Sequence, residues 1–273
     1  MSIITISHSA FSSGREVAER VASILDCRCV SREVLLEASQ RYGIPEAKFF
    51  EVLETEPHWW ERWMESLRLY RITLQAAMCE VAHGGKIVYH GRAGQELFPG
   101  IRHVLRVFVD APLEYRIERV KARKELSEEA ARHYLMELDR IRTRRLKALF
   151  SIDWRDPTRY DLLLNSSRMS VETAAHLIVE AAQREEYQPN PESEQAYWDL
   201  TTTARVQAAL ITSGETRALN INVTAEKGQV HLSGVLINPV LEQEIIHIVE
   251  GIPGVTKIVA DFVTAPIDDF MFH

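Results

Sequence analysis

The stretch "ITISHSAFSSGREVAERVASIL", residues 4–25, decides the fold. It opens with a short apolar run, continues with a loop of small residues, and from Gly14 places apolar residues at helical spacing. A strand, a tight loop and a helix in this order form the layout of a phosphate-binding loop, because loop and helix-terminal N–H groups attract anions. The usual motif is Gly-x-x-x-x-Gly-Lys-[Ser/Thr]. Here the loop has one glycine, Gly14, and Arg15 stands near the place of the lysine.

The composition is that of a globular protein with one large domain or two smaller ones. The chain has 273 residues, of which 46% are hydrophobic and 26% charged. It has no run of eighteen apolar residues and no basic and apolar leader, so we expect a cytoplasmic protein. Cys27, Cys29 and Cys79 lack the spacing of a metal site or a Cys-x-x-Cys motif, so we expect small buried thiols and no bound metal.

The net charge of −7 is unevenly distributed. From residue 186 onward the chain has 4 Lys+Arg and 12 Asp+Glu, whereas residues 1–185 have 28 and 27. This shift indicates two units with different surfaces. The acidic C-terminal part argues against nucleic-acid binding.

The first unit, residues 1–184, alternates strands and helices. Helices are expected at 14–25, 31–43, most of 49–85 with an interruption near Pro57, 113–150 with a break at 126–129, and 170–183; strands are expected at 3–6, 86–91, 103–112 and 160–167. This order predicts an α/β fold with a mostly parallel sheet covered on both faces. Ligands of such sheets bind at the carboxyl ends of the strands, here at 7–15, 91–94 and Asp110.

A second, smaller unit follows a polar linker. Residues 185–198 contain Pro189 and Pro191 and break every periodicity. Residues 199–266 then read as helix, strand, strand, helix and strand, with a turn at Lys227-Gly228. This predicts a small α+β domain of αββαβ order, followed by a tail at 267–273.

Six segments in chain order carry a family resemblance. They are "ITISHSAFSSGREVAERVA", "SREVL", "GRAGQELF", "VFVDAPLEYRIERVKAR", "DRIRTRR" and "YDLLLNSSRMSVETAAHLI". On these segments the first unit resembles the cytidylate kinase-like family of P-loop nucleotide kinases. The resemblance implies ATP with Mg²⁺ carried by the nucleotide, and phosphoryl transfer to a nucleoside monophosphate. Phosphoryl transfer needs positioning and positive charge around the transferred group.

The same resemblance implies roles for particular residues. The donor phosphates would be held by Ser9, Ser12, Ser13, Gly14, Arg15 and Glu16. The acceptor would be bound by Arg32, Gly91, Arg92, Arg119, Arg123 and Asp139. The catalytic charges would be Arg15, Arg140, Arg142 and Arg144, the last three from a lid that closes over the transferred group. Asp139 would orient one of these arginines or reach a metal-bound water.

Each of these roles has a plainer alternative. The loop can be an ordinary strand-to-helix turn capped by Ser12 or Ser13, and Arg92 can be a surface arginine at a strand end. Arg140 and Arg144 are four residues apart and share one helix face, whereas Arg142 projects from another. The lid helix can therefore also be a solvated helix with ion pairs along its surface.

The sequence departs from the family pattern at the loop and at two acceptor positions. No lysine stands between Ser7 and Glu16, and Ala10 and Phe11 bring Cβ atoms where positive φ is expected. Ser31 and Ala93 stand where the family has acids. Two hypotheses follow: a nucleoside-monophosphate kinase, or a catalytically impaired regulatory or scaffold protein that senses a nucleotide.

Two further features bear on partners. "GQVHLSGVL" and "VEGIPGVTKIV" make the second unit similar to the BON domain, which implies binding to a protein partner or a phospholipid surface. Its acidic character disfavours anionic membranes. Trp59, Trp60 and Trp63 lie in the segment that would belong to the acceptor-binding helices, where they would stack on a base, form a hydrophobic helix face or form a subunit interface. The sequence leaves a homo-oligomer open.

Overall fold

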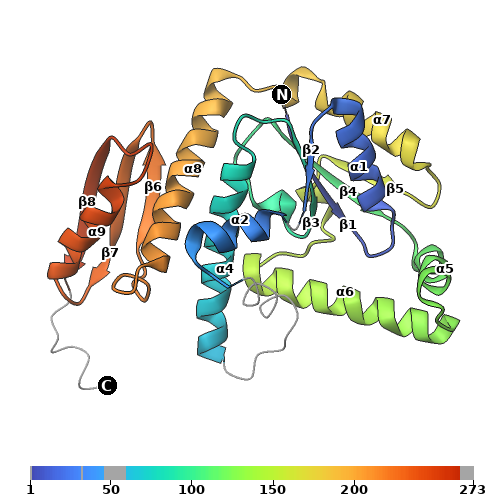
Figure 1. Ribbon diagram of the computed structural model, residues 1–273, viewed down its shortest axis with the longest axis horizontal. Coiled ribbons are helices and arrows are strands. Elements are labelled where there is room, and N and C mark those ends of the chain that lie inside the picture. The colour runs from blue at the N-terminus through green and yellow to red at the C-terminus, as the bar shows by residue number, and fades with distance from the viewer. Residues whose placement is uncertain (1, 32, 46–59, 265–273) are drawn as a thin grey trace. The chain divides into compact units, whose positions relative to one another are not determined.

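The computed structural model describes residues 2–31, 33–45 and 60–264, without the side chains of Leu35 and residues 60–66 (Figure 1). The predicted roles of Arg32, of the tryptophans at 59, 60 and 63, of Pro57 and of the tail 267–273 lie outside the described residues. The chain divides into two compact units, Met1–Val34 with Ala82–Asn190, and Leu35–Val81 with Pro191–His273. Within the described residues, no helix has both the length and the apolar character to cross a membrane.

The first unit is built on a five-stranded sheet. Its strands in spatial order are β2 Arg28–Val30, β3 Ile87–Gly91, β1 Ile3–His8, β4 Val104–Asp110 and β5 Leu162–Asn165. All neighbouring strands are parallel, and Ser7 of β1 pairs with Gly91 of β3 and Phe108 of β4. The carboxyl ends of β1, β3 and β4 therefore meet at one edge of the sheet.

Helices cover both faces of this sheet. On one face α1 Gly14–Leu25 and α7 Val171–Ala182 pack on the sheet, and Ile6, Val21 and Ile178 are fully buried in one cluster. On the other face Phe108 packs beside Trp154, with 5.5 Å between ring centroids. The long pair α5 Leu113–Lys124 and α6 Glu128–Phe150 has its own apolar cluster. At the predicted break at 126–129, Ser127 caps α6 by accepting from the Ala130 N–H. The predicted α/β fold with a parallel sheet flanked by helices is thus confirmed.

The second unit has two parts that are far apart in the sequence. It contains most of α2 Glu33–Tyr42, the helix α4 Trp60–Val81, and the C-terminal elements α8 Pro191–Thr212, β6 Asn222–Glu226, β7 Gln229–Leu236, α9 Val240–Glu250 and β8 Lys257–Thr264. Strands β6 and β7 are antiparallel, and β7 and β8 are parallel. The predicted αββαβ order is confirmed, and positive φ at Lys227 and Gly228 forms the predicted turn.

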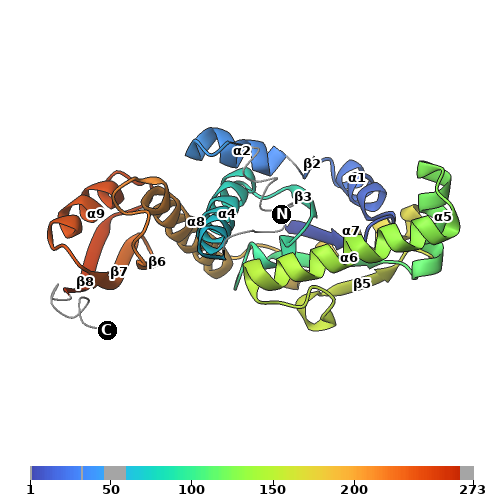
Figure 2. The same ribbon diagram turned by 90° about the horizontal axis from the view of Figure 1, so that it is seen from below.

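The predicted linker is largely helical. Residues 185–198 form the short 3-10 helix η3 Glu185–Tyr187 and the first two turns of α8. Pro191 begins the helix, since proline fits the first helical position, where its missing N–H has no intrahelical acceptor. The Tyr197 hydroxyl donates to the Cys79 carbonyl of α4. This contact stabilises the first turns of α8, and it could not be inferred from the sequence. In Figures 1 and 2, α4 and α8 lie side by side.

The structure also tests the predicted bounds of individual helices and strands. Helix α1 spans the predicted residues, and α2 ends before Gly43, whose φ of +64° is that of a helix-terminating glycine. Strand β2 was not predicted. It has three residues, which is too short for a readable alternation, and it forms by pairing with β3.

Candidate functional site

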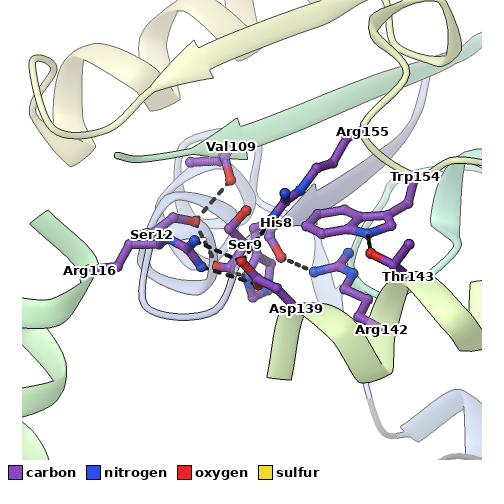
Figure 3. A network of polar contacts seen from close by, with 10 residues as sticks. All are labelled: His8, Ser9, Ser12, Val109, Arg116, Asp139, Arg142, Thr143, Trp154 and Arg155. Carbon is purple, nitrogen blue, oxygen red and sulfur yellow. Dashed lines mark hydrogen bonds and ion pairs between the residues drawn. The ribbon is translucent and has the colours of Figure 1, made fainter. Parts of the chain in front are cut away.

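The loop between β1 and α1 is held from below by buried serines. The Ser12 hydroxyl lies 2.9 Å from both the Ser9 and the Val109 carbonyl oxygens (Figure 3). The Ser166 hydroxyl donates to the Ser12 carbonyl at 2.5 Å. Ser12 is fully buried. Its hydroxyl therefore fixes the loop to β4, and the expected part of Ser12 in holding the donor phosphates stays a prediction.

Two residues of the loop adopt a backbone conformation that favours glycine. Phe11 has φ of +64° and Ser13 has φ of +62°. The predicted positive φ is thus found at Phe11 and not at Ala10. Gly14 is required for another reason: a Cβ there would lie 2.1 Å from the Cβ of His8. The loop therefore keeps the shape of a glycine-rich loop although it has one glycine.

The N-terminus of α1 is open to an anion. The residue before the helix, Ser13, makes no side-chain capping hydrogen bond. The N–H groups of Gly14, Arg15 and Glu16 occupy the first turn, where a helix supplies no acceptor of its own. The positive end of the helix dipole lies at the same place. Next to it the Ser9 hydroxyl is buried and has no hydrogen-bond partner among the described residues.

Arg142 of α6 is the buried cation of this site. It is 8% exposed, donates to the His8 carbonyl at the end of β1, and its guanidinium carbon lies 3.9 Å from the centroid of the Trp154 ring (Figure 3). Its Nε and one terminal nitrogen are buried and find no partner in the part of the chain that the structure describes. A guanidinium with two unused donors is arranged for an oxyanion such as phosphate.

Burial and neighbouring positive charge dominate the electrostatics of the site. Burial, with the charge of Arg92 as the next cause, lowers the pKa of Arg142 from 12.5 to about 10. Burial and the charge of Arg142 lower the pKa of His8 from 6.5 to about 4. His8 is therefore neutral at pH 7, while Arg142 stays charged. An anion bound here would stabilise the charged forms of Arg142 and His8.

A second, compensated arginine group lies beside it. Arg116 of α5 is 4% exposed and binds Asp139 of α6 through both terminal nitrogens, at 3.2 and 2.8 Å. Arg155 donates to the same carboxylate at 2.7 Å. Asp139 thus orients arginines, as one predicted role has it, but its partners are Arg116 and Arg155 and not the predicted lid arginines. This group ties α5, α6 and the following loop together (Figure 3).

The structure separates the other predicted residues. The Arg15 side chain is 67% exposed and binds Glu19 at 2.7 Å, one turn along α1, so it does not face the open helix terminus. Arg140 is exposed and binds Glu137 at 2.6 Å, and Arg144 is exposed as well. Glu16 binds Arg119 at 2.7 Å, which joins α1 to α5. Three other residues were predicted to bind the acceptor. Arg92 and Arg123 are exposed. Gly91 lies at the end of β3, where the sheet register places it opposite Ser7.

Sequence reasoning missed four residues of this site: His8, Arg116, Trp154 and Arg155. His8 had a signal, because it ends β1 within the segment already singled out. Arg116 lies in the first turn of the helix after β4, also at a strand's carboxyl end. Trp154 and Arg155 follow the lid helix in a loop whose sequence has no periodicity or motif. Only the tertiary structure therefore shows that they belong to the site.

The donor set fits a phosphate better than a directly bound metal. Within 2–31, 33–45 and 60–264, no three His, Cys, Asp or Glu side chains come together as metal ligands. The unused donors are N–H groups and a guanidinium, which bind anions.

The model of the cytidylate kinase-like family matches residues 3–168, and that of the BON domain matches residues 199–266. A cytidylate kinase from Methanocaldococcus jannaschii is 32% identical over 104 residues, which cover 37% of this chain and 58% of that protein, less than two thirds of its length. A cytidylate kinase from Methanopyrus kandleri is 27% identical over 177 residues, or 62% of this chain and 86% of that protein.

One solved structure supports the fold alone. It is described as an uncharacterized protein from Eubacterium ventriosum ATCC 27560, and it matches 67% of this chain and 100% of its own length with a TM-score of 0.52 and 18% identity. At this identity the match carries no information on ligand or activity.

Proposed function

Because the chain belongs to the cytidylate kinase-like family, we propose that it binds ATP–Mg²⁺ beside the N-terminus of α1 and transfers the γ-phosphoryl group to a nucleoside monophosphate. The observation that carries the proposal is Arg142, a buried guanidinium with two unpartnered nitrogens among the described residues, beside a helix start without a side-chain cap. The relatives named cytidylate kinase favour CMP as the acceptor.

The site's own groups suit the charge requirement of this reaction. Bound ATP–Mg²⁺ would supply the phosphoryl group. The N–H groups of Gly14, Arg15 and Glu16 would hold phosphate oxygens, and Arg142 would neutralise charge that develops on the transferred group. Arg142 thus takes the role that the family gives to a loop lysine, and Arg15 contributes its backbone N–H. Arg116 and Asp139 would position α6, which carries Arg142.

One observation favours a second function. The loop has no lysine, and the one cation at the expected place, Arg15, is exposed and bound to Glu19. A protein that binds the nucleotide without turning it over would retain Arg142 and the helix terminus while lacking a loop cation. The second candidate is therefore a catalytically impaired nucleotide sensor that acts on a protein partner or a phospholipid through its BON domain.

One experiment separates the two functions. The full chain is titrated with ATP–Mg²⁺ and with CMP, dCMP and UMP, while the heat of binding and the release of ADP are followed. We expect turnover with CMP that falls more than about 100-fold in Arg142→Gln and less than about threefold in Arg15→Gln. Binding without turnover would establish the second function, and the absence of any nucleotide binding would refute both.

A further inference from the structure

A cavity of about 360 Å³ lies inside the second unit. Helix α4 forms one side with Arg68 and Arg71, and α8 contributes Gln207. The segment that leads into β6 and the start of that strand, residues 219–223, and Ser233 of β7 also line it. The volume is in the range of small-molecule sites, and the walls come from elements that pack on each other.

The lining of this cavity is positively charged in an acidic part of the chain. Among the residues whose side chains the structure describes, it contains two arginines and neither Asp nor Glu, although the chain from residue 186 onward has three times as many acids as basic residues. Arg68 and Arg71 are three residues apart, so they share one face of α4. Both charges thus come from α4, and the C-terminal elements add the uncharged donors and acceptors of Asn220, Asn222 and Ser233.

The two arginines have different tasks. Arg68 donates to the Leu219 carbonyl at 2.9 Å and so holds the segment before β6 against α4. Arg71 is exposed and makes no ion pair with any residue that the structure describes. Its planar group is therefore available for a ligand, and a guanidinium prefers a phosphate or carboxylate that accepts two parallel hydrogen bonds.

We infer that this cavity is a binding site for a small free phosphorylated molecule of up to nucleotide size. Arg71 binds the phosphate, and the Asn220 and Asn222 amides with the Ser233 hydroxyl bind the polar remainder. A free molecule fits better than a membrane surface, since the surrounding acidic domain repels anionic lipid. The ligand would connect α4 to the strands of the BON domain. The inference does not depend on phosphoryl transfer at the loop site.

Hydrogen exchange of the full chain, followed by mass spectrometry, tests the site locally. The probes are CMP and inorganic phosphate at millimolar concentration, and vesicles that contain phosphatidic acid. We expect CMP to slow exchange in residues 216–223, with phosphate giving a smaller effect. Arg71→Gln should weaken this protection about tenfold in ligand concentration, as expected for one charge-assisted contact, and Arg71→Lys should restore part of it.

Two further variants make the result specific. Lys257→Gln removes an exposed charge from β8 that does not line the cavity, and it should bind like the wild type. Arg142→Gln should abolish protection around the loop at 9–16 and leave protection of 216–223 intact, so the failure of one site is distinguishable from failure of the other. The inference is overturned if neither free probe protects 216–223, if Arg71→Gln is protected as the wild type is, or if only vesicles give protection.

Discussion

Replacing Arg142 by methionine should cost the protein its ligand and almost none of its fold. Burial lowers the pKa of this guanidinium from 12.5 to about 10, which corresponds to about 3 kcal/mol of unfavourable free energy for the charged form. The contact with the Trp154 ring at 3.9 Å stabilises the charged guanidinium by about 2 kcal/mol. The hydrogen bond to the His8 carbonyl returns about 1 kcal/mol. The terms nearly cancel, so Arg142→Met should change the free energy of unfolding without ligand by about 1 kcal/mol or less.

The effect on ligand binding should be large. Each of the two unpartnered nitrogens of Arg142 would contribute about 1.5–3 kcal/mol to a charged ligand, so Arg142→Met should weaken ATP–Mg²⁺ binding by at least about 100-fold. Urea unfolding with and without ATP–Mg²⁺ measures both quantities. A ligand at a hundred times its Kd stabilises the wild type by about 2.7 kcal/mol, and at the same ligand concentration this gain should fall to about 0.4 kcal/mol or less in the variant.

Arg140→Met is the matched control on the same helix. Arg140 is exposed and bound to Glu137, so the change should alter stability by about 0.5 kcal/mol and binding by less than about threefold. The reasoning is refuted if Arg142→Met binds as the wild type does, or if Arg140→Met loses as much affinity as Arg142→Met.

Three further predictions concern stability. The folded-state pKa of His8, about 4, lies below its unfolded value of 6.5, so the protein should lose stability as the pH falls through this window, by at most about 3 kcal/mol. His8→Asn should flatten that loss in urea unfolding at several pH values, and an unchanged profile would contradict the assignment. Ser13→Gly should raise the free energy of unfolding by about 0.5–1 kcal/mol by relieving a φ of +62°, whereas Phe11→Gly should lower it by about 1–2 kcal/mol, because that ring packs beside Tyr134. Thermal unfolding measures the stability of both variants. If both variants were stabilised or both destabilised, the assignment of strain to Ser13 and of packing to Phe11 would be wrong. Arg205→Leu should destabilise the second unit by about 2–3 kcal/mol, because it removes the partner that binds both oxygens of Glu80 at 2.5 and 3.1 Å. Amide exchange in α4 reports this loss, and unaltered exchange would show that the pair contributes nothing.

The sequence predicted the fold well where local signals agree. The bounds of α1 follow from its apolar spacing, and the Ser127 cap separates α5 from α6. Strand β2 was not predicted, because a strand of three residues is too short to show an alternating pattern. The first turns of α8 were not predicted either, because Pro191 indicates a helix break to a reader who does not know the contact of Tyr197 with α4.

The candidate site shows how far sequence reasoning reaches for single side chains. The strand ends and Arg142 were named as candidates and stay predictions, and the partner that each arginine binds depends on the residues around it. Glu19 follows Arg15 by four residues, so that ion pair was visible in the sequence. The pairing of Arg116 with Asp139 was not, because it joins two helices whose approach only the tertiary structure fixes.

The discontinuity of the second unit has a consequence for how the chain comes to fold during synthesis. Helix α4 leaves the ribosome with its Cys79 side awaiting α8, and the whole stretch from Ala82 to Asn190 must be translated before that partner exists. Until then its apolar side is exposed to water and to other nascent chains. Segments that arise early and are buried late are those that chaperones protect. A gene truncated at residue 190 would make this temporary state permanent, because α4 would lack the C-terminal elements with which it forms one compact unit.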